Sequence, residues 1–168
     1  MISRVDVPII MKEVGFGMSR ETVKTWIDFG IEYVDVSGKG GTNFIQIENN
    51  RKQKTLYTFD HYGFSTVESL LDVKDLPVHV FASGGIRDAY DVVKALVLGA
   101  KMVGLSRYFL ELVTHYPLEE AILKATQFIE DIKLIMTVLN VTSIEKLPTK
   151  QYLLSPRLEH FIRQRKST

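Results

Sequence analysis

The sequence predicts an α/β fold with a parallel sheet, because short apolar runs alternate with helical patterns four times along the chain. The apolar runs have the length and composition of buried strands, and the segments between them carry apolar residues at helical spacing. Glycine or polar residues follow each run. Since the carboxyl ends of parallel strands meet at one edge of a sheet, we expect any functional site at that edge.

Length and composition are typical of one globular domain. The chain has 168 residues, of which 45% are hydrophobic and 24% charged, and its net charge is +1. This charge gives no reason to expect a nucleic-acid partner. The absence of cysteine excludes disulfides, zinc–thiolate sites and a thiol nucleophile. Without a long apolar run or a signal-peptide pattern, we expect a cytoplasmic protein with no membrane partner.

The first strand–helix unit supplies a cation at a strand end. Residues 8–11 form a short apolar run, and Lys12 follows at its carboxyl end. The loop 13–17 is polar and contains two glycines. Ser19 is a suitable N-cap for the helix that follows, and Gly30 is a suitable end for it.

The second unit continues into a long polar segment. Residues 33–36 read as a strand that leads into the small and glycine residues of 37–44. The segment 45–64 is polar and basic in its first half, and we expect a long loop there, either a functional lid or a mobile insertion. Ser65 and Glu68 have the spacing of a capping box and predict the start of a helix.

The third unit combines a strand, a glycine pair and a helix start. Residues 78–82 form a mainly apolar run, Gly84 and Gly85 follow, and a helix is expected from Asp88 to a left-handed cap at Gly99. This combination suits an anion, most often a phosphate. A tight strand-to-helix turn without a ligand fits the same pattern equally well.

The fourth unit and the tail complete a single expected domain over 1–168, with the four units in 1–114 and helices in 115–168. Residues 101–105 predict a strand, and 108–113 predict a short helix. A long amphipathic helix is expected after Pro117. The tail should contain one helical turn at 143–147, followed by basic, solvated residues, namely Arg163, Arg165 and Lys166.

Three motifs together resemble one family of enzymes. The stretches 12–19, 35–44 and 82–87 are similar to those of type 2 isopentenyl-diphosphate isomerase, in the same order and at similar distances. This family is an FMN-dependent (β/α)₈ barrel that interconverts isopentenyl and dimethylallyl diphosphate. The resemblance runs over nearly the whole chain but covers only the C-terminal half of the family's protein. It therefore implies strands five to eight of a TIM barrel and a C-terminal helical tail.

The resemblance also implies roles for particular residues. Lys12 corresponds to a lysine beside the flavin ring, where a cation would stabilise the reduced flavin. Ser37 and Thr42 would contact the flavin, although both also suit local turn chemistry. Two strand exits would hold the FMN phosphate. The first consists of Gly84, Gly85, Ile86 and Arg87, and the second of Ser106 and Arg107. Many relatives have Ala-Gly at the second exit. No side chain is assigned as catalytic, because the flavin itself is the expected acid and base.

The family's cofactors and partners define further expectations. These are FMN, NADPH to reduce it, and Mg²⁺, with isopentenyl and dimethylallyl diphosphate as substrates. The family's metal ligand and diphosphate-binding motif lie in its first half, so no metal ligand is expected here. We expect a truncated product, or one piece of a split or cleaved protein, rather than a duplicated half used alone.

Such a half is expected to be inactive in isolation and to pair with the missing N-terminal half or with a second copy. The family's full enzymes are also homo-oligomers. Four strands cannot close an eight-stranded barrel, so two sheet edges and part of the inner strand faces would lose their cover. The expected inner-face residues are Ile10, Val34, Val36, Val80 and Val103.

Other functions remain open from the residues alone. Another FMN barrel, such as an α-hydroxy-acid oxidase, would place a histidine base after a late strand, and the loop 37–42 has none. An enzyme like inosine-monophosphate dehydrogenase would need a cysteine nucleophile, and this chain has no cysteine. A non-catalytic phosphate-binding or assembly fragment is the alternative from a different class. The four histidines lack metal-ligand spacing, and His79, inside a strand, is expected to be structural.

Overall fold

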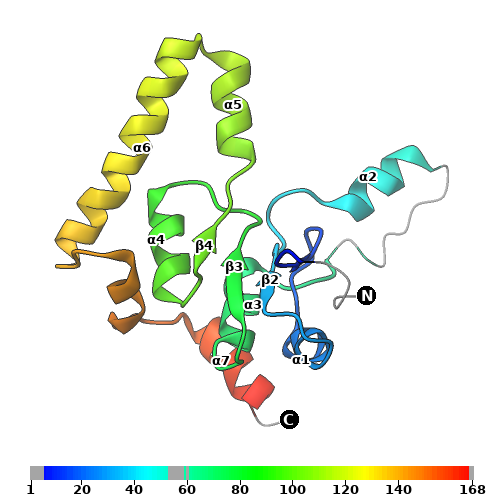
Figure 1. Cartoon of the computed structure of the whole chain (residues 1–168). Coiled ribbons are helices and arrows are strands. Elements are labelled where there is room, and N and C mark those ends of the chain that lie inside the picture. Colours follow the sequence, from blue (N-terminus) through cyan, green and yellow to red (C-terminus); the bar gives the residue numbers. More distant parts are fainter. Residues whose placement is uncertain (1–5, 53–58, 60, 167–168) are drawn as a thin grey trace.

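A four-stranded parallel sheet forms the centre of the chain (Figure 1). The computed structural model describes residues 6–52, 59 and 61–166. The strands are paired in sequence order, as predicted, and they are β1 (Ile10–Lys12), β2 (Tyr33–Asp35), β3 (His79–Ala82) and β4 (Met102–Val103). Lys12 is the last residue of β1, in agreement with its predicted place at a strand end.

A helix follows each strand, and three of these helices begin at a side-chain cap that the sequence predicts. Ser19 accepts a hydrogen bond from the amide of Thr22, and Ser65 forms a complete capping box with Glu68. Asp88 caps the third of these helices through the amide of Asp91. The helices are α1 (Arg20–Asp28), α3 (Thr66–Val73), α4 (Ala89–Val97) and α5 (Arg107–His115).

Among the described residues, helices cover only one face of the sheet. Met11, Val34 and Val80 are paired in register and belong to the core that α1, α3 and α4 build against the strands. Val34 is fully buried there and Val36 follows it into the same core. The expectation that these valines face the barrel interior is therefore wrong. Register depends on strand pairing, and a shift of one residue exchanges the two faces of a strand.

The opposite face of the sheet is open. Ile10 is 50% exposed and Met102 is 60% exposed. Between them His79 stacks on Tyr33 with ring centroids 5.0 Å apart, and Phe81 lies 6.1 Å from the same tyrosine. Of the five residues expected on the inner face, Ile10 alone lies on this open face, while Val103 packs against the helical core.

The predicted loop after β2 contains a helix. Residues Phe44–Arg51 form α2, which projects from the body of the molecule (Figure 1). Asn43 caps it by accepting a hydrogen bond from Gln46, and Glu48 forms ion pairs with Arg51 and Lys52. The expectation of a loop is wrong for this part, because a cap and local ion pairs stabilise a helix without an apolar face. Residues 53–58 and 60 lie outside the described residues.

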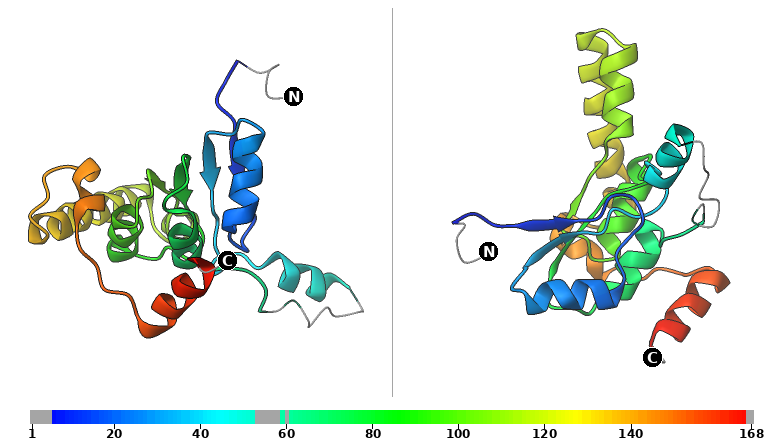
Figure 2. Two further views of the ribbon diagram at one scale, coloured as in Figure 1. Left: turned by 90° about the horizontal axis from the view of Figure 1, so that it is seen from below. Right: turned by 90° about the vertical axis from the view of Figure 1, so that its right-hand side faces the viewer.

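The C-terminal third is helical, as predicted. The long helix α6 (Leu118–Val138) and α5 form a hairpin that projects from the sheet (Figures 1 and 2). Phe128 of α6 and Leu147 of the 3₁₀ helix η3 (Ile144–Thr149) complete a second core against α4. In the part of the chain that the structure describes, no helix has the length and apolar character needed to cross a membrane.

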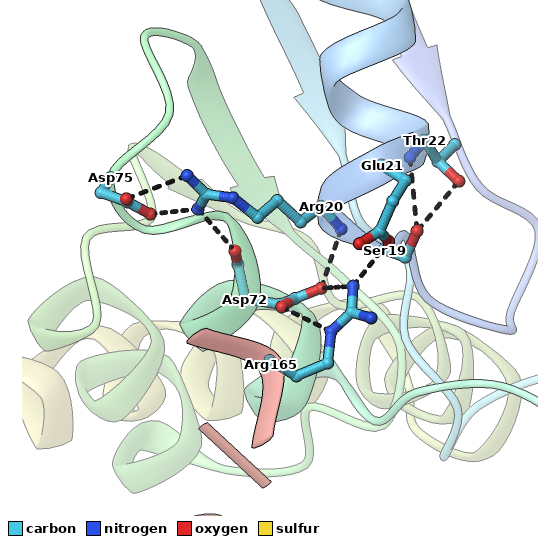
Figure 3. A network of polar contacts seen from close by, with 7 residues as sticks. All are labelled: Ser19, Arg20, Glu21, Thr22, Asp72, Asp75 and Arg165. Atoms are coloured by element: carbon cyan, nitrogen blue, oxygen red, sulfur yellow. Dashed lines mark hydrogen bonds and ion pairs between the residues drawn. The ribbon is translucent and has the colours of Figure 1, made fainter. Parts of the chain in front are cut away.

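The basic tail forms a docked helix, α7 (Pro156–Lys166), which packs against α3. Arg165 donates to both carboxylate oxygens of Asp72, at 2.9 and 2.8 Å, and to Glu21 at 2.6 Å (Figure 3). The side chain of Asp72 is only 2% exposed. The expectation of a solvated tail is therefore wrong for Arg165, whose partners lie 144 and 93 residues away in the sequence.

Candidate functional site

Three strand ends meet in one hydrogen-bonded group of side chains. The ammonium of Lys12 on β1 donates to Asp35 Oδ2 of β2 at 2.7 Å and to Ser83 Oγ, directly after β3, at 2.9 Å. Ser83 Oγ lies 2.8 and 2.9 Å from the two oxygens of Asp35, which also accepts the amide of Ser37 at 3.1 Å. The Lys12 side chain is 54% exposed and that of Asp35 is 14% exposed. The group therefore presents a cation at the carboxyl edge of the sheet, with its counterion beneath.

The glycine pair after β3 packs against the loop after β2. Gly84 and Gly85 have φ values of +90° and +72°, in the left-handed region. A Cβ on Gly84 would lie 2.1 Å from the carbonyl oxygen of Gly38, and one on Gly85 would lie 3.0 Å from the Cα of Gly40. The close approach of two backbones thus already requires glycine at these positions.

The same loop offers amides that could bind an anion. The amides of Gly84, Gly85 and Ile86 have no hydrogen-bond acceptor among the described residues. The amide of Arg87, by contrast, donates to the carboxylate of Asp91 at 3.3 Å. Three amides of this loop are therefore available to an anion, and that of Arg87 is already engaged.

A cavity of about 140 Å³ lies beside this loop, between the N-terminal ends of α3 and α4. Lys39, Arg87 and Lys94 bring positive charge to its wall, and Asp91 brings one negative charge. A larger hollow of about 490 Å³ lies between α5 and α6. That hollow belongs to the projecting hairpin, away from the strand ends, so we place the candidate site at the glycine loop (Figure 1).

The remaining predicted site residues are placed less directly. Ser106 precedes α5 without a side-chain cap, and the Arg107 guanidinium points to Glu111 at 2.7 Å, which raises the pKa of Arg107. The Thr42 side chain is exposed, at the point where the loops after β1 and β2 meet. Ser37 is buried beside Asp35. The structure thus brings Lys12 and Ser37 to one group and leaves the side chains of Thr42 and Arg107 in solvent.

Sequence reasoning missed three polar residues at this edge. They are Asp35, Ser83 and Thr66, whose hydroxyl donates to the carbonyl oxygens of Ser83 (2.8 Å) and Gly84 (2.5 Å). A carboxylate ending a short apolar strand was a usable signal for Asp35, because a charge at such a place needs a partner. Thr66 carried no signal beyond its position after the capping serine. No group of three or more metal-ligating side chains occurs among the described residues.

Parallel strands with a cation at one carboxyl end and acceptor-free amides at another are typical of α/β proteins that bind a phosphate-bearing cofactor at this edge. Residues 1–154 match the model of the FMN-dependent dehydrogenase family. The chain belongs to that family, whose members bind FMN.

The curated relatives are isomerases. The isopentenyl-diphosphate delta-isomerases of Staphylococcus saprophyticus and Staphylococcus haemolyticus are 48% and 49% identical to this chain. Each match covers 98% of this chain and 48% of the relative, so the chain spans about half the length of these relatives. The homologous part is their C-terminal half, which confirms the resemblance drawn from the three motifs.

Solved structures confirm the predicted fold class. The flavin-binding domain of baker's yeast flavocytochrome b2 is 25% identical, with a TM-score of 0.64 over 95% of this chain and 40% of that chain. A mandelate oxidase shares the fold at 18% identity, with a TM-score of 0.65 over 92% of this chain and 42% of its own. The four parallel strands therefore correspond to part of an FMN-dependent TIM barrel.

The residues present fit FMN. The cofactor carries a phosphate at one end and a ring that gains negative charge on reduction at the other. The free amides of Gly84, Gly85 and Ile86 suit the phosphate. The half-exposed ammonium of Lys12 suits the ring, because it is held at the end of β1 by Asp35 and Ser83 without being enclosed.

Proposed function

We propose that this chain forms the FMN-binding half of a type 2 isopentenyl-diphosphate isomerase. The observation that carries the proposal is the Lys12 ammonium held by Asp35 and by Ser83, the residue before the acceptor-free glycine amides, in a chain 48% identical to such isomerases. The substrates would be isopentenyl and dimethylallyl diphosphate, with NADPH as reductant. The Mg²⁺ ligand and the diphosphate-binding groups would come from the part of the relatives that lies outside this chain. The assembled enzyme would be a cytoplasmic homo-oligomer.

Each part of the site would have a separate role. Reduced FMN, when bound, would supply the acid and base for moving the substrate's double bond. Lys12 would hold positive charge against the ring's N1/O2 edge. Ser37 and Thr42 would contact the ring. Two strand exits would bind the phosphate through backbone amides, the first through Gly84, Gly85 and Ile86 and the second through Ser106 and Arg107.

The first test removes the cation. In the full-length protein, Lys12→Met should weaken binding of reduced FMN by about tenfold, the value of one charge-assisted hydrogen bond. Binding of oxidised FMN should change less, because the negative charge develops only on reduction. Lys24→Met removes an exposed lysine of α1 and serves as the control. Equal effects on the two oxidation states would contradict the role given to Lys12.

Activity tests the rest of the proposal. The full-length protein with FMN, NADPH and Mg²⁺ should convert isopentenyl diphosphate to dimethylallyl diphosphate, as followed by product analysis. The isolated 168-residue chain should not. Turnover by the isolated chain would show that the second half is dispensable, and no turnover by the full-length protein would refute the proposed reaction.

An α-hydroxy-acid oxidoreductase is the second candidate, since the solved neighbours include flavocytochrome b2 and mandelate oxidase. Such a reaction needs a base to abstract the substrate's hydroxyl proton. The loop after β2 offers Ser37 and Lys39 in place of a histidine. Reduction of bound FMN by a panel of 2-hydroxy acids would favour this candidate, and a protein purified without flavin would favour a non-catalytic role.

A further inference from the structure

The Asp35 carboxylate is the common acceptor of the site. It receives the ammonium of Lys12, the hydroxyl of Ser83 and the amide of Ser37, all within 3.1 Å. It is the last residue of β2, so the sheet holds its backbone on both sides through β1 and β3. The acceptor is thus rigid, whereas the lysine that it binds has a flexible four-carbon stem.

The hydroxyl of Ser83 connects the Lys12 ammonium to the Asp35 carboxylate. A serine hydroxyl has one hydrogen, and both oxygens of Asp35 lie within 2.9 Å of Ser83 Oγ. With that hydrogen given to Asp35, Ser83 Oγ accepts from the Lys12 ammonium at 2.9 Å. The lysine is therefore held from two strands other than its own, at a fixed point above the edge of the sheet.

The burial of Asp35 distinguishes the Lys12–Asp35 ion pair from an exposed surface pair. Exposed pairs are weak because solvent screens them and because two mobile side chains must be ordered. Here the carboxylate is 14% exposed and is ordered by other donors, so only the lysine remains to be fixed. We propose that Asp35 is the positioning residue of the site, which holds the Lys12 ammonium where the flavin ring would meet it. This inference rests on the proposed function.

A distinctive consequence follows when the lysine is absent. With Lys12 in place, the pair is neutral and Asp35 serves to aim the ammonium. Without Lys12, Asp35 becomes an uncompensated negative charge close to where reduced FMN carries its own. Removing the Asp35 charge should therefore harm binding of reduced FMN in the wild-type background and help it in the Lys12→Met background. A merely structural carboxylate would be harmful to remove in both.

The experiment is a double-mutant cycle in the full-length protein, with the dissociation constant of chemically reduced FMN as the readout. Asp35→Asn should weaken binding roughly threefold to tenfold in the wild type. In Lys12→Met the same substitution should tighten binding by a similar factor. Asp28→Asn, which removes an exposed carboxylate of α1, should change neither value.

A second variant serves as a control for misfolding. Ser83→Ala keeps both charges and removes only the hydroxyl, and it should weaken binding in the wild type but have no effect in Lys12→Met. Weakening by Asp35→Asn in both backgrounds, or no effect in either, overturns the positioning role while FMN binding itself persists. A wild-type protein that binds no FMN overturns the proposed function and this inference with it.

Discussion

Ser37 is the residue whose backbone conformation is least expected from its identity. It has a φ of +35° and is 8% exposed, in a region that glycine adopts far more readily. Its carbonyl accepts the amide of Gly17, and its own amide donates to Asp35. The chain thus keeps a serine where glycine would be relaxed, which is typical of a functional position.

Replacing this residue should separate stability from cofactor binding. Ser37→Gly relieves left-handed strain of about 1–2 kcal/mol and adds about 0.5–1 kcal/mol of unfolded-state entropy. The free energy of unfolding should therefore rise by roughly 0.5–1 kcal/mol, as measured by urea denaturation. FMN binding should weaken, because the hydroxyl expected to contact the ring is lost. Ser37→Val, which adds a branched side chain in the same conformation, should lower stability. Unchanged FMN affinity in Ser37→Gly would remove Ser37 from the site.

At the scale of elements, Arg165 is the residue that joins the C-terminal helix to two other helices. Arg165 of α7 bridges Asp72 of α3 and Glu21 of α1 (Figure 3). Its pKa is raised mainly by the hydrogen bond to Asp72 and then by that to Glu21. Phe161 of α7 also packs edge-on against Phe64, 5.4 Å away. Arg157 of α7 pairs with Glu68 of α3 at 2.7 Å, and Leu158 and Ile162 pack against the main core. Ion pairs, an aromatic contact and apolar packing thus connect the tail to the strand–helix units.

Arg165→Met should therefore weaken the docking of α7. The substitution leaves the buried Asp72 carboxylate with the amide of Arg20 but without a charged partner. We expect a loss of about 2–3 kcal/mol in the free energy of unfolding, or faster amide hydrogen exchange confined to α7. Lys133→Met breaks an exposed ion pair of α6 and should cost less than about 1 kcal/mol. Equal effects of the two substitutions would show that the bridge is no stronger than a surface pair.

The dependence of the free energy of unfolding on acid pH tests the contact between Arg165 and Glu21. The hydrogen bond from Arg165 is the largest cause that lowers the pKa of Glu21 from 4.5 to about 2. A carboxyl with a lowered folded pKa stabilises the protein above its unfolded pKa, and this stability is lost as the pH falls from about 4.5 to about 2. Because Glu21 is 68% exposed, solvent screens the pair and the change should stay below about 1 kcal/mol. Arg165→Met should flatten this part of the curve.

At the scale of the whole molecule, the open face of the sheet leaves apolar side chains exposed to solvent. Ile10 and Met102 are at least half exposed there, beside the aromatic residues Tyr33, His79 and Phe81. β1 and β4 are also edge strands, with unpaired amides and carbonyls. A few hundred Å² of exposed apolar surface, at about 25 cal/mol per Å², corresponds to several kcal/mol. That is comparable with the total stability of a domain, about 5–15 kcal/mol.

The isolated chain should therefore associate, with a second copy or with the remaining half of the protein. A symmetric pair would supply eight strands and could cover both open faces. Sedimentation of the 19.2 kDa chain at micromolar concentration should show species larger than a monomer. Co-expression with the other half should replace this self-association by a one-to-one complex. A compact single species at the monomer mass would show that the half-sheet is stable unaided.

Apart from α2 and α7, the sequence by itself determined the order of the elements, the starts of the helices and the family. Ser19, Ser65 and Asp88 mark helix starts because a cap depends on residues three positions away. Lys12 and the glycine pair could also be placed from local sequence, because the end of an apolar run shows where a strand stops. α2 was missed because its stabilising ion pairs follow no apolar periodicity.

The tertiary structure alone decided which strand face the helices cover and which charges meet. Lys12 is 23 residues from Asp35 and 71 from Ser83, and Arg165 is 93 residues from Asp72. No local pattern specifies such pairs, because they depend on strand register and helix docking, and a register shift of one residue would turn Asp35 to the covered face. The site is therefore a property of the paired strands, although each of its residues stands at a strand end that the sequence already marks.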